Sequence, residues 1–318
     1  MSRQTDFFGS YTGKTLAKNY LINGNFDVWQ RGVTQTTSGY GSDDRWYNVY
    51  IGTTGVCSRQ EFPLNQTDVP GNSRYYSRTV VTSVAGAGNY CQKIQSIESV
   101  RTLAGKKATV SFYAKADSVK NLGVHFLQIF GTGGSPTAPV AGSAQTVVLS
   151  SAWQKFVLTF NVPLLPSGAV LGTNLNDNLS LKFAFDSGST YSWMLGVGQQ
   201  SGTFDIAQVQ VEEGSVATEF ERRTYGEELA LCQRYYQQYI TILCGGYGTA
   251  GMVLYNSYLL AVNMRSVPVP TLLTVPGYSN SSGVGSWIPD AGRITIYVSI
   301  TATGYGYTQV GYGLDAEL

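Results

Sequence analysis

Apolar and polar residues alternate strictly in several segments of the first two thirds of the chain. In Lys107–Lys115 the even positions are apolar, whereas the odd positions carry polar residues and Tyr113. The same alternation recurs in Lys155–Val162 and Leu179–Phe185. The apolar positions of the three segments are Ala108, Val110, Phe112, Ala114, Phe156, Leu158, Phe160, Val162, Leu179, Leu181, Phe183 and Phe185. A period of two indicates half-buried strands, and the turn residues between the segments favour an antiparallel β-sandwich.

The segment Gly202–Tyr239 marks a change in this pattern. Phe204 and Ile206 are out of phase with Val209 and Val211, and a phase slip within one strand predicts a β-bulge. The apolar spacing becomes helical from Tyr225 onward. The predicted apolar face consists of Leu229, Cys232, Tyr236 and Tyr239. We expect one short helix, packed either on the sandwich or on the same helix of two other subunits.

The last part of the chain is a second predicted β region, rich in tyrosine and glycine. Ile294, Ile296, Val298 and Ile300 alternate with other residues there. A β domain this small is marginally stable alone, so we expect oligomerisation to add buried surface. The expected organisation is an N-terminal arm at 1–18, a β-sandwich at 19–219, a linker helix at 220–240 and a C-terminal Tyr/Gly-rich β domain at 241–318.

Charge and cysteine content narrow the class of protein. Charged residues make up 13% of the chain and the net charge is +1, so no strong field steers it to nucleic acid or an anionic membrane. No apolar run is long enough to predict a transmembrane helix. The four cysteines form no CxxC pair and, with a single histidine, leave no zinc spacing. We expect buried thiols, with a Cys57–Cys91 bridge as the alternative.

Catalytic constellations are not evident. A Ser-His-Asp or Cys-His site would require His125, which lies in an apolar, strand-like run. Adjacent acids such as Glu227 and Glu228 point in different directions on a strand or a helix, so they are no preset acid–base pair. We therefore expect a protein without enzymatic activity.

Aromatic side chains in the glycine-rich C-terminal region are the candidates for ligand contact. Trp287, Tyr305, Tyr307 and Tyr312 can stack on sugar rings, and we predict them as carbohydrate-binding residues. The alternative is that they pack in a subunit interface, where aromatic residues are also enriched.

Several sequence blocks together resemble a family of tailed-bacteriophage virion proteins. The family includes tail-fibre, head-fibre and minor structural proteins, and the resemblance covers about residues 19–240. The blocks are NYLINGNFDVWQRG with DDRW, then GKKATVSFYAKA, WQKFVLTFNVP and DIAQVQVEEGSVATEFERRTYGEELALCQRYY. The first region also resembles a carbohydrate-binding-module jelly roll. Together with the alternation described above, the resemblance implies an all-β chain: a jelly-roll β-sandwich, one short helix and a small C-terminal β domain.

Such modules often hold a structural calcium ion. The resemblance implies Asp27, in Gly24-Asn25-Phe26-Asp27, and Asp205, in Phe204-Asp205-Ile206, as two of its ligands. Oxygen ligands from both ends of the domain are chemically sound for calcium. The alternative is that Asp27 is a turn residue and Asp205 an acid at a strand edge.

The expected function is that of a non-enzymatic virion structural protein. We expect a homotrimeric fibre subunit that is attached to tail or capsid proteins through residues 1–18 and binds a host-surface glycan or receptor. The virion would assemble in the host cytoplasm and be released by lysis. One alternative is a head fibre or capsid-decoration protein bound to the shell. A second is a glycan-processing tail enzyme.

Overall fold

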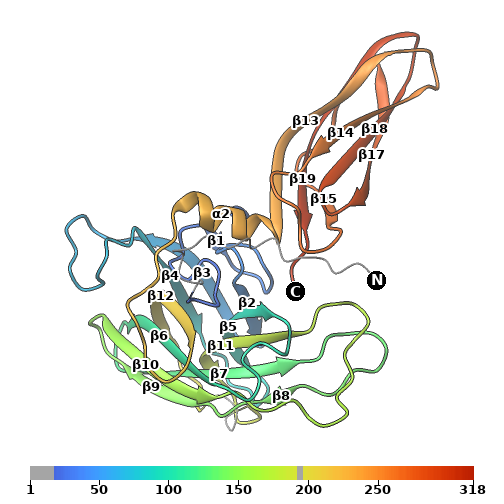
Figure 1. Ribbon diagram of the computed structural model, residues 1–318. Coiled ribbons are helices and arrows are strands. Elements are labelled where there is room, and N and C mark those ends of the chain that lie inside the picture. Colours follow the sequence, from blue (N-terminus) through green and yellow to red (C-terminus); the bar gives the residue numbers. More distant parts are fainter. Residues whose placement is uncertain (1–17, 192–195) are drawn as a thin grey trace, which may run out of the picture.

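Two antiparallel sheets packed face to face make up most of the computed structural model, which describes residues 18–191 and 196–318 (Figure 1). The first sheet has the order β1 (Thr34–Gln35), β3 (Thr54–Glu61), β4 (Tyr75–Thr82), β12 (Gly202–Glu213), β6 (Lys107–Ala116) and β10 (Gln154–Asn161). The second has the order β2 (Tyr47–Ile51), β5 (Tyr90–Glu98), β11 (Asn178–Ser187) and β7 (Lys120–Ile129), and β8 (Val140–Ala141) and β9 (Gln145–Leu149) both pair with β7. The predicted all-β jelly-roll sandwich is confirmed.

The core between the sheets contains the apolar positions that alternation predicts. Phe112 and Phe183 are fully buried and meet edge to face, with ring centroids 5.1 Å apart. Phe126 meets Phe160 in the same way at 5.4 Å. Each fully buried side chain of this kind stabilises the fold by roughly 1.5–3 kcal/mol. Cys57 and Cys91 are buried in this core as free thiols, so no disulfide joins them.

The predicted β-bulge is present in β12. The register of β12 against β6 shifts between Ala207 and Gln210, and Gln208 within the shift has a left-handed φ of 49°. The extra residue changes the phase of the strand, so Ile206 before the bulge and Val209 after it both reach the core.

The predicted helix is α2 (Tyr225–Gln233), which is shorter than the expected 220–240. The Thr224 side chain accepts a hydrogen bond from the backbone N–H of Glu227, and the Glu227 side chain accepts one from the backbone N–H of Thr224. This capping box explains why the helix starts here. The helix ends early because Tyr236 already belongs to β13 (Tyr236–Gly248), so Tyr236 and Tyr239 lie on a strand.

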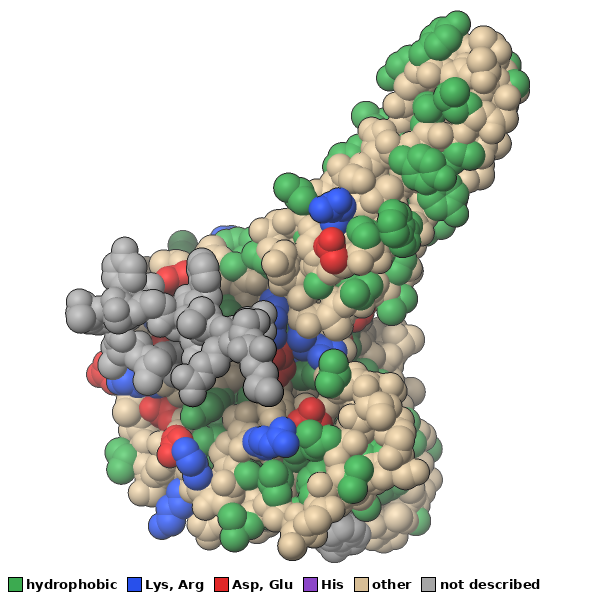
Figure 2. All heavy atoms as spheres, turned by 45° about the vertical axis from the view of Figure 1, so that its right-hand side comes forward, with side chains coloured by type: hydrophobic (Ala, Val, Ile, Leu, Met, Phe, Trp, Pro, Cys, Tyr) green, Lys and Arg blue, Asp and Glu red, His purple; other side chains and the backbone are tan. Residues whose placement is uncertain are grey.

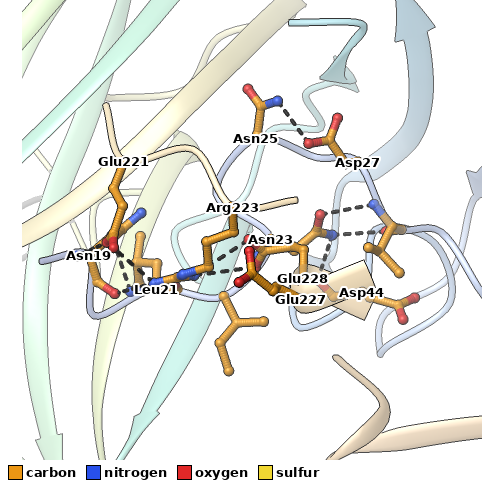
Figure 3. A network of polar contacts seen from close by, with 12 residues as sticks. Asn19, Leu21, Asn23, Asn25, Asp27, Asp44, Glu221, Arg223, Glu227 and Glu228 are labelled. Atoms are coloured by element: carbon orange, nitrogen blue, oxygen red, sulfur yellow. Dashed lines mark hydrogen bonds and ion pairs between the residues drawn. The ribbon is translucent and has the colours of Figure 1, made fainter. Parts of the chain in front are cut away.

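Helix α2 packs on its own chain (Figure 3). Glu228 accepts a hydrogen bond from the backbone N–H of Asn23, and Arg223 donates to the backbone oxygens of Asn19 at 2.7 Å and Leu21 at 3.0 Å. Cys232 is also buried. The side of the helix that would otherwise need another subunit is therefore covered by the sandwich of the same chain.

No helix in the described ranges is long and apolar enough to cross a membrane.

The C-terminal unit is a second, smaller pair of sheets that projects from the sandwich (Figure 1). One sheet has the order β13, β19 (Gly304–Asp315) and β15 (Val269–Leu272), and β16 (Gly277–Ser279) also pairs with β19. The other has the order β14 (Val253–Leu259), β18 (Arg293–Ile300) and β17 (Ser281–Asp290). Its core includes the predicted inward residues Ile294, Ile296 and Val298. Hydrophobic side chains are scattered over its surface, and few charged ones accompany them (Figure 2).

Buried charged residues join the C-terminal unit to the sandwich. Arg31 and Arg45 of the sandwich both pair with Glu317, whose side chain is 5% exposed. The guanidinium carbon of Arg45 lies 3.4 Å from the ring centroid of Tyr235, and that of Arg31 lies 3.7 Å from the ring centroid of Tyr236. These contacts fix the direction in which the C-terminal unit leaves the sandwich.

His125 on β7 is buried without a polar partner. Its side chain is 0% exposed, and neither ring nitrogen has a hydrogen-bond partner among the described residues. Burial and, to a smaller extent, the charge of Lys182, directly opposite on β11, together lower the pKa of His125 from 6.5 to about 4. The imidazole is therefore neutral in the folded protein at neutral pH.

We expect acid to destabilise the fold through His125. The unfolded chain binds the proton near pH 6.5 and the folded chain only near pH 4, so the stability linked to His125 is present above pH 6.5 and is lost as the pH falls toward 4. The loss is about 3 kcal/mol for a shift of this size. His125→Leu should flatten this part of the pH dependence of the unfolding free energy, measured by urea titration at several pH values. An unchanged slope would contradict the prediction.

Candidate functional site

A groove lies on the outer face of the first sheet. Its volume is about 340 Å³, and its walls come from β6, β10 and β12 together with the connecting segments around residues 70 and 220. Ser111 and Tyr113 line it from β6, because the even positions of that strand face the core and the odd positions face outward. Lys155 lies directly opposite Tyr113 on β10. The remaining lining residues are Pro70, Gly71, Gln208, Glu219, Phe220 and Arg222.

Gln208 shapes the groove from the bulge in β12. Its side chain is buried, and its Nε2 donates to the backbone oxygen of Pro70 at 2.6 Å and to Ser73 Oγ at 2.7 Å. A non-glycine residue in the left-handed region costs of order 1–3 kcal/mol and persists only where its surroundings hold it. The bulge thus ties the segment around residue 70 to the sheet and forms one wall of the groove.

An aromatic cluster continues from Tyr113 along the same face. Phe62 and Tyr76 are buried there, with ring centroids 4.7 Å apart. Trp153 packs on both rings, at 5.3 Å from Phe62 and 5.2 Å from Tyr76, and remains partly exposed. Tyr113 packs against this cluster and is also partly exposed. The surface therefore offers aromatic faces beside polar groups.

The predicted calcium ligands have different partners. Asp205 accepts two hydrogen bonds from Arg78, at 2.7 and 2.8 Å, and Lys115 Nζ lies 3.8 Å away. Asp27 accepts from Asn25 Nδ2 at 2.8 Å, and burial raises the pKa of the Asp27 carboxyl. Within residues 18–191 and 196–318, no group of three or more His, Cys, Asp or Glu side chains is placed to hold a metal ion. Both carboxylate oxygens of Asp205 are engaged by cations, so in this arrangement Asp205 does not fit the role of a calcium ligand. The calcium site stays a prediction.

The four predicted carbohydrate-binding residues lie in three separate places. Tyr305 and Tyr307 lie on the outer face of one C-terminal sheet, where Tyr305 pairs with Tyr247 across the strands. Trp287 is 62% exposed on the other sheet. Tyr312 is 3% exposed and belongs to the core of the C-terminal unit, so its ring does not reach the surface. Alternation along β19 places Tyr312 on the same inward face as Val310. In the sequence, the alternation of glycine with tyrosine obscured this signal.

The groove residues were not predicted as a site. The alternation does indicate that Ser111 and Tyr113 face outward. Gln208 and Arg222 join them only through the bulge and the segment that follows β12. The aromatic and charged residues that meet there are separated by up to 109 positions, from Tyr113 to Arg222, and no local spacing relates them.

Comparisons with known proteins show no family for this chain. No protein-family model matches the chain, and no curated protein matches it either. Among solved structures, a family 4 carbohydrate-binding module shares 17% identity with a TM-score of 0.34, covering 60% of this chain and 98% of its own. A family 11 carbohydrate-binding module from Clostridium thermocellum, solved with a mixed-linked tetrasaccharide, shares 12% identity with a TM-score of 0.34, covering 58% of this chain and 98% of its own.

The enzymatically active domain of tailspike protein 4 from bacteriophage CBA120 is another similar structure. It shares 13% identity with a TM-score of 0.35, and the match covers 62% of this chain and 21% of the tailspike chain. The shared part is thus about a fifth of that longer protein.

Proposed function

We propose that this protein is a non-enzymatic structural subunit of a bacteriophage virion that binds a host-surface glycan. The groove on the outer face of the first sheet is the observation that carries the glycan-binding role. The family resemblance of residues 19–240 supports the virion role, and the projecting C-terminal unit suits a fibre subunit (Figure 1). Residues 1–18 remain the proposed attachment segment, and all of them except Lys18 lie outside the described residues.

The groove has the chemistry that sugar binding needs. The partly exposed ring of Tyr113 offers a face on which the C–H groups of a pyranose can stack. Ser111 supplies a hydroxyl, and Glu219 and Arg222 supply an acceptor and a donor for sugar hydroxyls. Small-ligand sites combine apolar surface with a few placed polar groups. This groove combines Pro70, Tyr113 and Phe220 with polar and charged side chains.

The lining favours binding over cleavage. Glycoside hydrolysis uses two carboxyl groups that flank the scissile bond. Among the residues that line the groove, Glu219 is the single acid. Asp205, on the same face, is engaged by Arg78 and Lys115. A bound glycan would therefore meet one available carboxylate.

The C-terminal unit supports the proposed homotrimer. Leu243, Tyr247, Tyr305 and Tyr307 expose between 40% and 72% of their surfaces on one outer face of that unit. An uncharged aromatic and aliphatic face of this kind fits an interface with further copies. A light-scattering mass of three times 34.4 kDa is expected, and a mass near 34.4 kDa would exclude the trimer.

The glycan-binding role is tested by removing the Tyr113 ring. Tyr113→Ala should weaken binding to a host cell-surface polysaccharide roughly tenfold, because the stacking face is lost. Affinity electrophoresis against a panel of such polysaccharides measures the effect. Tyr255→Ala is the matched control, since Tyr255 is 64% exposed on the C-terminal unit.

Two outcomes would count against this site. If Tyr113→Ala binds as well as the unaltered protein, the groove is not where the glycan binds. If Tyr305→Ala or Trp287→Ala abolishes binding instead, the glycan site lies on the C-terminal unit, as the sequence predicted.

A further inference from the structure

From the charged residues that line the groove, we infer that its ligand is an acidic glycan, with sugar carboxylates held by Lys155 and Arg222. The inference rests on the proposed glycan-binding function and names its ligand class. Lys155, Arg222 and Glu219 are the charged lining residues, two cations to one anion. Charged residues are sparse in this chain, at 13%, so their meeting at one groove needs a chemical reason.

Arg222 is held in place before any ligand arrives. Its Nη2 donates to Ser73 Oγ at 3.0 Å, and Ser73 is itself buried and bonded to Gln208 and to Asn25 Oδ1. The guanidinium lies over Gly71, where an added Cβ would come within 3.2 Å of Arg222 Nε. A guanidinium fixed in this way can offer its remaining N–H groups to a carboxylate as a pair of parallel hydrogen bonds.

Lys155 lies beside the stacking ring. It occupies the position directly opposite Tyr113 on the neighbouring strand, where side chains on the same face come within about 5 Å at Cβ. The Lys155 side chain is exposed. Among the described residues, no carboxylate pairs with it. A sugar stacked on Tyr113 would therefore place its ring substituents near an unpaired ammonium.

Two other cations on this face are already engaged by a carboxylate. Arg78 and Lys115 share Asp205, so their charge is largely compensated. Lys155 and Arg222 are different, because neither has an ion pair within 4.0 Å among the described residues. Glu219 has none either, and its carboxylate is available to accept sugar hydroxyls. Arg222 donates to Ser73, and its charge also acts on the Asp27 carboxyl, but it has no carboxylate in contact. A neutral glycan would use the ring and Glu219 but would leave both cations without a carboxylate in contact, whereas a carboxylated glycan would use all of them.

The experiment compares each acidic polymer with its own uncharged form. Polygalacturonate, alginate and hyaluronate are tested on the full chain by affinity electrophoresis, each beside a preparation whose carboxyl groups have been reduced to alcohols. Neutral mixed-linked β-glucan is included in the panel. At least one acidic polymer should bind, and its reduced form should bind about tenfold more weakly.

Variants assign the effect to the two cations. Lys155→Gln and Arg222→Gln should each weaken binding of the acidic polymer about fivefold to tenfold and reduce its salt dependence. Arg222→Lys should restore part of the loss. Lys107→Gln is the matched control, because Lys107 is exposed on the same face of β6 but outside the groove lining. Melting curves establish that each variant is folded.

The outcomes separate this inference from the function on which it rests. Equal, Tyr113-dependent binding of the acidic and reduced polymers would overturn the acidic preference and leave glycan binding intact. An equal loss in Lys107→Gln would also overturn it, because the attraction would then be diffuse. Failure of every polymer in the panel, acidic, reduced and neutral, would count against both.

Discussion

Replacing Glu317 with alanine is expected to lower the free energy of unfolding by about 3–5 kcal/mol. Glu317 pairs with Arg45, whose side chain is 1% exposed, and with Arg31, whose side chain is 8% exposed. Burial alone would lower the pKa of Arg45, but Glu317, together with smaller contributions from neighbouring groups, outweighs it and holds that pKa above its ordinary value. Without the carboxylate, two arginines stay charged in a site that water hardly reaches.

Urea unfolding followed by tryptophan fluorescence measures the effect. The control is Glu213→Ala, which breaks the pair with Lys106 at 2.8 Å, where both side chains are about half exposed. That change should cost less than about 1 kcal/mol, because exposed pairs contribute little. Similar losses in the two variants would mean that the Glu317 site is far better hydrated than its burial indicates.

The second large effect is expected at Asp43, inside the sandwich. Lys93 Nζ lies 2.5 Å from Asp43 Oδ2, and the two side chains are 1% and 0% exposed. Ser77 Oγ donates to the same carboxylate at 2.9 Å and Ser42 Oγ at 2.8 Å. Burial acts to lower the pKa of Lys93, but the charge of Asp43 and the hydrogen bonds to Asp43 and the Cys57 thiol contribute to a net rise, so the ammonium persists. Asp43→Ala leaves that ammonium unpaired and should cost about 3–5 kcal/mol.

Removing both charges together distinguishes the pair from its two members. Lys93→Met combined with Asp43→Leu removes both charges and keeps apolar volume, and replacing a whole buried pair in this way is often close to neutral. The double variant should therefore be more stable than Asp43→Ala. If the two are equally unstable, the hydrogen bonds from Ser42 and Ser77, not the charge of Lys93, account for the loss.

The contacts around Glu317 also bear on function. A fibre subunit has to present its distal surface in a fixed direction, and a hinge at residue 235 would let the C-terminal unit swing. Stacking of Arg45 on Tyr235, together with the two hydrogen bonds from Arg234 to Glu98 at 2.8 Å, opposes such motion. The Glu317 variant therefore serves a second purpose, because it should loosen the C-terminal unit while leaving the groove residues in place.

The sequence by itself determined the strands around 107–115, 155–162, 179–185 and 294–300, their inward faces and the bulge in β12. These features depend on a local period of two, and a phase slip between Ile206 and Val209 is visible without any partner strand. The spacing of the apolar residues also predicted where the helix lies, but it did not predict where the helix ends. Whether residue 236 continues a helix or starts a strand depends on pairing with Asp315, 79 positions away.

Only the tertiary structure decided which residues meet. Asp205 is an ion-pair partner because strand register places Arg78 and Lys115 beside it. Tyr312 is buried because the second sheet of the C-terminal unit covers it. The groove combines Tyr113, Lys155 and Arg222, and Glu317 reaches Arg45 across 272 positions. Periodicity reports which face a side chain occupies, but the partner on that face is set by register and by the docking of distant segments.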